Sequence, residues 1–379
     1  MVVAESPSLT IGIEEEYLLV DLVTREVASD PPPDMLKMCE ERIPGLVQPE
    51  FLTSQIEVAT GVCISAAQAK QELADLRRTV AEVARGYGLA PIAASSHPFS
   101  EWRAQRHTDK ERYNMLARDM QSVARRLLIC GMHVHVGIDD DELRIGLMNQ
   151  VSYFLPHLLA LSTSSPFWRG EDSGLKSYRL SVFDELPRTG LPSRFESFGE
   201  YKRHVDVMVG AQLIPDASMI WWDVRPSARF PTLEMRITDV CPNLEDAIAI
   251  AALYQSIIRM LYRLRRRNQR WRAYDNMLLN ENRWRAKRYG IDAGLVDFGK
   301  GEVVPCADLL EELIELTQED AATLDCVHEV LRCREIVRHG TGAHRQLAVY
   351  NQAIQAGYDR RDALCQVVDG LIAETVRGC

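Results

Sequence analysis

The apolar pattern of the chain changes near Pro242. Before that residue, short runs rich in β-forming residues alternate with helical stretches, as in TIGIEEEYLLVD (10–21) and ICGMHVHVGI (129–138). After it, almost the whole chain has a helical pattern, and no linker composition separates the two parts. We therefore predict an α+β fold in one domain over residues 1–379, strand-rich over 9–241 and helical over 242–379. An antiparallel or mixed sheet would carry helices on one face.

Local signals place the individual elements. Two further β-rich runs are MIWWDVRP (219–226) and FPTLEMRITD (230–239). Ser65 is a plausible N-cap for an amphipathic helix over 65–88, and Asn243 for a long helix through Arg267. Other helices are expected near 111–128, 273–288, 306–318, 320–338, 343–356 and 359–376.

Composition excludes several classes of protein. The 54 acidic and 44 basic residues give a net charge of −10, which argues against nucleic acid or an anionic membrane as the main partner. No run of 18 apolar residues is present, so we expect no membrane-spanning helix. The N-terminal MVVAESPSLT lacks the basic and apolar regions of a secretory signal.

The cysteines indicate the compartment. There are nine, an odd number, and none forms a CxxC pair. A disulfide framework and a zinc ribbon are therefore not expected, and a reducing cytoplasm fits best. The oligomeric state stays open, with a homo-oligomer as one option.

The acidic run GIEEEY is the first candidate site. Alternate residues of a strand share a face, so Glu14 and Glu16 should point the same way. Apolar neighbours such as Ile11 and Ile13 suggest a partly buried strand, in which paired carboxylates need a cation or protonation. Taken alone, the pattern fits metal binding and a solvated acidic face equally well.

Glu50 and Glu57 form a weaker candidate. Their spacing of seven residues would put them on opposite faces of one continuous strand. A turn or bulge between them could bring them together. By itself, the segment favours two surface glutamates.

The alternating run GMHVHVG is the third candidate. His133 and His135 should face one side, with Gly131 and Gly137 leaving room for a group to approach the backbone. HxH on a strand is a common metal-ligand spacing. A single buried histidine is usually only a hydrogen-bonded core residue, but two on one face beside glycines favour a functional site.

The fourth candidate combines both signs of charge. Glu234 and Arg236 should share one strand face, either as a structural ion pair or as a metal ligand beside a phosphate-binding arginine. Arg225, Arg229 and Arg179 add positive charge. Arginines gathered around acidic strands suggest a polyanion bound through divalent cations.

Two stretches need separate interpretation. Residues 163–200 are aperiodic but contain six aromatic residues, so we expect an ordered functional loop that closes over substrates. The basic run RLRRRNQRWR (263–272) lies at a predicted helix C-terminus, where cations are favoured, so we expect a solvated or salt-bridged helix end.

Together the motifs resemble a known family. In order, the chain contains IGIEEEYLLVD, QPEFLTSQIEVAT, CGMHVHVGI, SPFWRGEDSGLKSYRLSVFDELPRTGLPS, WWDVRPSARFPTLEMRITDVCPNLEDAIAIAALYQ and ENRWRAKRYGIDAGLVDF. From about residue 9 to its end it resembles the bacterial type 2 glutamate–cysteine ligases, most closely the YbdK-like carboxylate–amine ligases. The resemblance implies a glutamine-synthetase-like catalytic fold, in which the concave face of a curved, mainly antiparallel sheet holds ATP and divalent cations.

The resemblance also assigns roles to residues. Arg236 and Arg179 would hold phosphate or the developing negative charge, Arg225 would join them in binding ATP, and His135 is left undecided. Mg²⁺ or Mn²⁺ would be held by Glu14, Glu16, Glu50, Glu57, His133 and Glu234.

The implied reaction is an ATP-dependent ligation. ATP would convert a poorly reactive carboxylate into an acyl phosphate, which an amine would attack to form an amide. Members of the branch are described as having weak glutamate–cysteine ligase activity, so the amino-acid-like substrates stay open. Two alternatives remain: a metal-dependent hydrolase that activates water, and a non-catalytic nucleotide-binding protein that retains the ligase fold.

Overall fold

The sheet is organised around one long strand. The computed structural model describes residues 6–379. The expectation that MVVAESPSLT is not a secretory signal concerns residues 1–10, of which residues 1–5 lie outside the described residues. Strand β1 (Ile11–Asp21) pairs antiparallel with three neighbours: β5 (Met132–Gly137), β3 (Gln55–Ala59) and β4 (Leu89–Ile92). The alternating pattern that predicted a strand over 10–21 is thus confirmed.

Three short strands widen the sheet at its two edges. Strand β11 (Thr232–Met235) pairs with β5, β10 (Val224–Pro226) pairs with β11, and β2 (Val47–Pro49) pairs with β3. The order is β10-β11-β5-β1-β3-β2, with β4 beside the far end of β1. Every pairing in this sheet is antiparallel, which confirms the predicted α+β class with a mainly antiparallel sheet.

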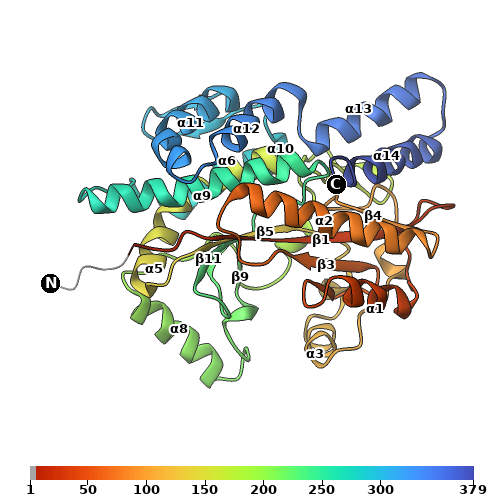
Figure 1. Ribbon diagram of the computed structural model, residues 1–379, viewed down its shortest axis with the longest axis horizontal. Helices are drawn as coiled ribbons and strands as arrows, with labels where there is room; N and C mark the ends of the chain where they lie inside the picture. The colour runs from red at the N-terminus through yellow and green to blue at the C-terminus, as the bar shows by residue number, and fades with distance from the viewer. Residues whose placement is uncertain (1–5) are drawn as a thin grey trace.

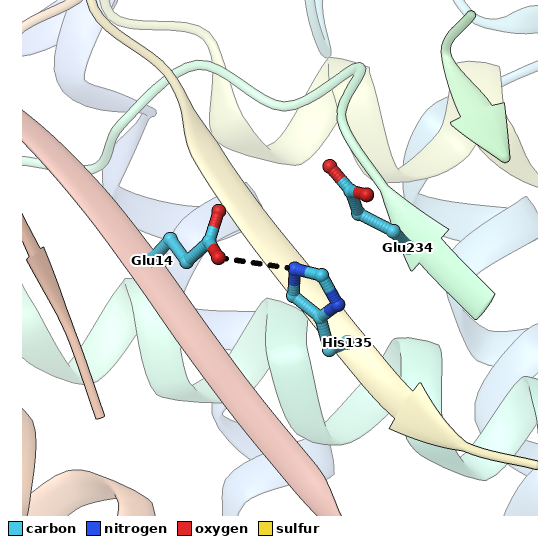
Figure 2. A group of neighbouring side chains, drawn as sticks. All are labelled: Glu14, His135 and Glu234. Atoms are coloured by element: carbon cyan, nitrogen blue, oxygen red, sulfur yellow. Dashed lines mark ion pairs between the residues drawn. The ribbon is translucent and has the colours of Figure 1, made fainter. Parts of the chain in front are cut away.

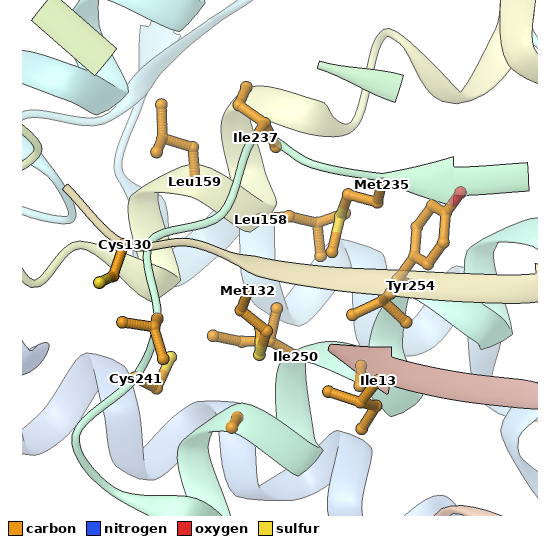
Figure 3. Packing of buried hydrophobic residues seen from close by; sticks show 14 of the residues in the cluster. Ile13, Cys130, Met132, Leu158, Leu159, Met235, Ile237, Cys241, Ile250 and Tyr254 are labelled. Atoms are coloured by element: carbon orange, nitrogen blue, oxygen red, sulfur yellow. The ribbon is translucent and has the colours of Figure 1, made fainter. Parts of the chain in front are cut away.

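Two long helices cover the back of the sheet. Helices α2 (Ala66–Arg85) and α9 (Leu244–Arg266) lie against it (Figure 1). Their predicted caps are confirmed, because Ser65 accepts the Gln68 N–H and Asn243 accepts the Glu245 N–H. Side chains from the sheet and from α9 interlock in this layer, where Figure 3 shows Ile13, Met132 and Met235 near Ile250 and Tyr254.

Helix α9 is the apolar centre of the helical layers. Although no unbroken apolar run of 18 residues occurs, α9 is long and apolar enough to cross a membrane, with a mean hydropathy of 1.3 over its best window. Since 78% of that window is buried inside the fold, we interpret α9 as a core helix. Further helices cover its outer side or lie beside β4: α6 (Leu155–Ser162), α10 (Asn276–Tyr289), α11 (Cys306–Thr323), α12 (Val327–His339), α13 (Gly342–Gln355) and α14 (Arg360–Thr375) (Figure 1).

The basic run at the C-terminal end of α9 is salt-bridged, as predicted. Arg263 donates from Nε and Nη2 to the carboxylate of Asp320 on α11, and its Nη1 lies 3.5 Å from Glu319. All nine cysteines are free, which agrees with the absence of a disulfide framework. Other regular elements include α1 (Pro33–Arg42), α5 (Asp141–Val151), β12 (Leu295–Asp297) and β13 (Glu302–Val304).

Three local expectations differ from the structure. The helix predicted over 111–128 is broken at Gln121, whose φ of +52° separates α3 (Glu111–Met120) from α4 (Ser122–Arg125). The strand predicted over 230–239 ends at Met235, because the next two backbone N–H groups donate to the carbonyl of Asp223. Helices are not confined to one face either, since α3 and α8 (Phe198–Gly210) lie on the opposite side from α9 (Figure 1).

The aperiodic segment 163–200 is folded into the body of the protein. It contains β6 (Phe167–Trp168), β7 (Glu171–Asp172), α7 (Arg179–Phe183) and β8 (Thr189–Gly190). The buried carboxylate of Asp239 accepts hydrogen bonds from the Ser164 N–H and from the hydroxyls of Ser165 and Ser177. These bonds anchor the first part of the segment to Asp239, and closure of the segment over substrates stays a prediction.

A fully buried ion pair joins the sheet to the helices. Glu15 lies on the back face of β1, between Glu14 and Glu16, and neither it nor Arg77 of α2 is exposed to solvent. Arg77 donates from Nε and Nη2 to Glu15 at 2.9 and 2.6 Å, and the Tyr17 hydroxyl donates to the same carboxylate at 2.6 Å. The other N–H groups of Arg77 bond the carbonyls of Cys241, Pro242 and Thr375.

We expect Glu15→Gln to destabilise the protein by about 3–5 kcal/mol, because it leaves the Arg77 charge buried without a counter-charge. Urea denaturation measures the loss. Glu311→Gln is the control, since it removes the carboxylate of a half-exposed pair with Arg334 and should cost no more than about 1 kcal/mol. Equal losses in the two variants would contradict the assignment.

Candidate active site

The front face of the sheet carries a cluster of two carboxylates and an imidazole. Glu234 of β11 lies opposite His135 of β5, and Glu14 of β1 lies opposite His133. Figure 2 shows Glu14 and His135 pointing toward one another, with 3.3 Å between Oε1 and Nε2. Ligand atoms of Glu14, His135 and Glu234 all lie within 4.8 Å of one another, which is close enough to hold one metal ion.

The two histidines have different surroundings. Nδ1 of His133 lies 3.2 Å from Glu14 and 3.4 Å from Nη1 of Arg236. Nδ1 of His135 instead contacts the Thr232 hydroxyl at 2.8 Å, which directs its Nε2 toward Glu14. The predicted shared face is confirmed. The geometry favours His135 as the imidazole of this cluster, whereas the family resemblance favours His133, so the choice of ligand stays a prediction.

A second cluster contains three carboxylates. Glu16 of β1 lies opposite Glu57 of β3, and the chain turns at residues 51–54 between β2 and β3. That turn brings Glu50 back, so that oxygen atoms of Glu16, Glu50 and Glu57 lie within 4.8 Å of one another. The reading of Glu50 and Glu57 as two separate surface glutamates is therefore wrong, and the turn considered as its alternative is present.

Three hydrogen bonds hold this carboxylate cluster in place. The Gly131 N–H donates to Glu16 at 2.7 Å, and Gln48 donates to Glu57 at 2.7 Å. The Tyr113 hydroxyl of α3 donates to Glu50 at 2.7 Å. Gln48 and Tyr113 had no sequence signal, because neither lies in a recognisable polar pattern. Only the pairing of β2 with β3 and the position of α3 bring them to the site.

The three-carboxylate cluster holds more negative charge than its surroundings neutralise. Burial, followed by the charge of Glu50, raises the pKa of Glu16 from its usual 4.5 to about 7. The same two causes raise the pKa of Glu57 well above its usual range. A divalent cation would relieve this repulsion, and hard cations prefer oxygen ligands of this kind. The described residues therefore fit Mg²⁺ or Mn²⁺.

The first cluster has the opposite electrostatic character. Burial opposes ionisation of Glu14, but hydrogen bonds from His133 and His135 hold its pKa below its usual range. Burial, followed by the charge of Arg236, lowers the pKa of His133 to about 4. His133 is therefore neutral near pH 7, which is the form that can bind a metal.

Glu234 lies between two guanidinium groups. Arg225 of β10 binds it through two hydrogen bonds of 3.0 and 3.1 Å, and Nη1 of Arg236 contacts its Oε1. Burial opposes its ionisation, but Arg236 and Arg225 hold the pKa of Glu234 below its usual range. Arg225 also donates to the carbonyls of Ser218 and Ile220. Most donors of Arg225 are thus already used within the protein.

Arg179 reaches the site across a glycine. A side chain at Gly131 would place its Cβ only 2.5 Å from Nη2 of Arg179, so only glycine leaves room for the guanidinium. The expected approach of a group to the backbone at Gly131 is confirmed. The guanidinium is buried and donates to the carbonyls of Ile237 and Arg236, at 3.3 and 3.2 Å.

All nine predicted site residues line two adjoining cavities. The larger, of about 370 Å³, is lined by Glu14, Glu50, Glu57, His133, His135, Arg225, Glu234 and Arg236. The smaller, of about 70 Å³, adds Glu16 and Arg179 and shares His133, Glu50 and Arg236 with the larger. Lys110, Arg112 and Arg229 also line the larger cavity. The size suits a small organic ligand, and the lining combines cation-binding carboxylates with anion-binding arginines.

Comparison with known proteins identifies the family. Residues 10–366 match the family described as Glutamate-cysteine ligase family 2. The chain belongs to this family. It is 62% identical to a Rhodospirillum rubrum protein named "Putative glutamate--cysteine ligase 2", covering 98% of this chain and 96% of the relative. A Jannaschia protein of the same name is 56% identical over 96% of each chain.

Two solved structures share the fold at low sequence identity. A glutamate–cysteine ligase from Francisella tularensis, solved in complex with AMP, has a TM-score of 0.70 and 13% identity, covering 98% of this chain and 90% of its own. A bifunctional glutathione synthetase from Pasteurella multocida has a TM-score of 0.67 and 15% identity. The match covers 97% of this chain and 52% of that protein, so the chain spans about half of its length.

We expect the metal-free protein to lose stability as pH rises from about 4.5 to 7, because folding raises the pKa of Glu16 across that interval. A carboxyl whose pKa is raised by folding stabilises the fold while protonated, and this contribution is lost as the folded group ionises. In EDTA, Glu16→Gln should therefore be more stable than wild type at pH 7.5, by up to about 3 kcal/mol.

Urea denaturation in EDTA at pH 5 and pH 7.5 measures the effect. Saturating Mg²⁺ or Mn²⁺ should remove most of the pH dependence in wild type and have little effect on Glu16→Gln. Glu302→Gln, at an exposed glutamate, is the control and should follow wild type. A Glu16→Gln protein with the wild-type pH dependence would contradict the account of the carboxylate cluster.

Proposed function

We propose that the site catalyses ATP-dependent formation of an amide from a carboxylate and an amine through an acyl phosphate. Membership of the glutamate–cysteine ligase family supports a carboxylate–amine ligase. The observation that carries the proposed mechanism is that both acidic clusters and the Arg236 guanidinium line two adjoining cavities, which share Glu50, His133 and Arg236. A nucleotide triphosphate needs this combination, because cations and arginines together neutralise its phosphates.

The proposed chemistry has two steps. A substrate carboxylate oxygen attacks the γ-phosphorus of ATP, the bond to ADP breaks, and an acyl phosphate forms. The amine nitrogen then attacks the acyl carbon, the bond to phosphate oxygen breaks, and the amine loses a proton as the amide forms. No protein nucleophile is needed. The site has to position the reactants and neutralise the charge of the phosphates, and no covalent intermediate with the protein forms.

The residues of this chain would divide the work. Arg236, beside Glu234 and His133, would donate to an oxygen of the transferring phosphoryl group. Arg179 lines the smaller cavity with Glu16 and would offset negative charge on the phosphoryl group from that side. When bound, Mg²⁺ or Mn²⁺ held by the two acidic clusters would neutralise phosphate charge. The walls of the cavity would keep water from the acyl phosphate.

The two alternative functions have less support. A metal-dependent hydrolase needs carboxylates and a metal-bound water but has no use for buried arginines beside them. A non-catalytic nucleotide-binding protein would not need all nine predicted site residues around the two adjoining cavities. Family membership also favours a ligase over both.

Several finer features belong to this proposal. The fold is of the glutamine-synthetase type with a curved sheet, and the chain forms one domain. The substrates are amino-acid-like, the enzyme works in the cytoplasm, and neither nucleic acid nor a membrane is a partner. The α+β architecture, the buried α9 and the free cysteines support these points. A homo-oligomer stays one option.

An ADP-release screen of amino acids in pairs, including glutamate with cysteine, tests the function with Mg²⁺ and with Mn²⁺. We expect ADP only when a carboxylate and an amine are both present, together with an amide of the summed mass minus water. Glu16→Gln should abolish the release. Amide hydrolysis without ATP would instead identify a hydrolase, and nucleotide binding without turnover of any pair would identify a non-catalytic protein.

We expect Arg236→Lys to lower kcat by about 10²–10³, or roughly 3–4 kcal/mol, as for loss of a charged donor to a developing negative charge. Lysine keeps the charge but loses the planar fork, so it should not rescue activity. The KM for ATP should change less than kcat if the contact forms mainly in the transition state. A lower melting temperature with an unchanged kcat would show that Arg236 only pairs with Glu234.

A further inference from the structure

Arg283 is a buried arginine that lines neither cavity of the site. It lies on α10, in the helical part of the chain, and only 8% of it is exposed. It makes four hydrogen bonds to two carboxylates that come from different parts of the chain. Nε and Nη2 donate to Asp223 at 2.7 and 3.2 Å, and Nη1 and Nη2 donate to Asp184 at 2.8 and 2.7 Å.

The first partner is connected directly to the backbone of Arg236. Asp223 lies between β9 (Trp221–Trp222) and β10, and its side chain is buried. Its carbonyl accepts the N–H groups of Arg236 and Ile237, at 2.8 and 3.1 Å. These two bonds turn the chain away from β11 immediately after Met235. The position of Asp223 therefore sets the direction in which the Arg236 side chain leaves the sheet.

The second partner is connected to Arg179. Asp184 is the C-cap residue of α7, the short helix that begins at Arg179. The guanidinium of Arg179 donates to the carbonyls of Arg236 and Ile237, the same residues whose N–H groups bond to Asp223. The contacts thus form a closed ring that runs from Arg283 through Asp223, Arg236 and Arg179 and returns through Asp184.

We propose that Arg283 is a positioning residue for the ligase reaction, because it holds Arg179 and Arg236 in fixed positions relative to each other. The proposal rests on the proposed function, in which those two arginines offset phosphate charge. An arginine suits the place because one planar group can bind two carboxylates through two bonds each. A lysine ammonium is a single point of charge. Lys287 already places such a charge near Asp184, with 3.5 Å between its Nζ and Oδ2 of Asp184.

Stability alone is a weak reason for such a buried network. Taking charges out of water offsets much of their mutual attraction, so buried ion pairs often contribute little net stability. Geometric precision has a larger effect in a catalytic site, where a misplacement of about 1 Å can cost about 10²-fold in rate. The ring therefore predicts a loss of rate in addition to any loss of stability.

Arg283→Lys tests the proposal, with Arg263→Lys as the matched control. Arg263 also binds a buried carboxylate, Asp320, through two nitrogens, but its pair joins α9 to α11 and touches no residue of the ring. Both variants should melt at a lower temperature than wild type. Only Arg283→Lys should lower kcat per folded molecule, by about 10²-fold, and only it should speed hydrogen exchange at the amides of residues 236 and 237.

A second comparison shows through which residues Arg283 acts. If it acts through Arg179, the double variant Arg283→Lys/Arg179→Lys should be little slower than Arg179→Lys alone, because the two changes disable one unit. Rate losses that multiply would overturn that route. Equal melting losses in Arg283→Lys and Arg263→Lys, with wild-type kcat and wild-type exchange in both, would show that Arg283 is only structural.

Two further measurements keep the test decisive. If Arg283→Lys does not fold, Asp184→Asn replaces it, since the Asp184 side chain is 29% exposed and its loss leaves the Asp223 link intact. That variant should lower kcat per folded molecule whatever its melting temperature, and an unchanged kcat would overturn the proposal. If wild type releases no ADP with any amino-acid pair, the proposed function fails, and the exchange rates at residues 236 and 237 alone decide whether Arg283 orders them.

Discussion

The rest of the structure depends on the buried pair of Glu15 and Arg77. Three consecutive glutamates on one strand cannot all face the same way, and the pair decides which of them is turned inward. Because the middle carboxylate has a fully buried guanidinium behind the sheet, its two neighbours are committed to the front. The same guanidinium bonds three carbonyls at the start of α9 and near the end of α14, so one side chain joins the sheet to the helical half.

The front of the sheet separates its charges into two regions. On one side, Glu234 contacts two arginines, and hydrogen bonds from two histidines stabilise the ionised form of Glu14. On the other, Glu16, Glu50 and Glu57 face one another without a basic partner of equal strength. The protein therefore offsets the charge of Glu14 and Glu234 with its own side chains, whereas the three-carboxylate cluster depends more strongly on a cation from outside. This division explains how a chain with a net negative charge can form a site suited to a polyanion: its arginines and a bound cation would both face the ligand.

Sequence alone could predict what depends on near neighbours. The shared faces of Glu14 with Glu16, and of His133 with His135, follow from the two-residue period of a strand. The caps at Ser65 and Asn243 follow from local hydrogen-bonding chemistry. The resemblance to a family then identified which of these faces belonged to one site. The register of Glu16 against Glu57 and of Glu234 against His135 agrees with that grouping.

What could not be predicted depends on distant partners. Arg77 looks like an ordinary charged position on an amphipathic helix, and its carboxylate partner is 62 residues away. Gln121, where a helix breaks, has no glycine or proline to signal the break. The segment 163–200 looked like a loop because its order comes from Asp239, which lies beyond the segment in sequence. In each case the missing information is a tertiary contact rather than a local preference.

The central place of α9 has a consequence for how the chain is made. The sheet and α2 are encoded before residue 242, but α9, the second helix that covers the back of the sheet, follows, and the last carbonyl that binds Arg77 belongs to Thr375. A ribosome that has released the chain only as far as residue 242 has therefore produced an apolar sheet face that α2 covers only in part, and an Arg77 guanidinium without its full set of acceptors. Exposed surface of this kind promotes aggregation. Burial of this face is therefore complete only after α9 has emerged, and Arg77 gains its last acceptor only with α14.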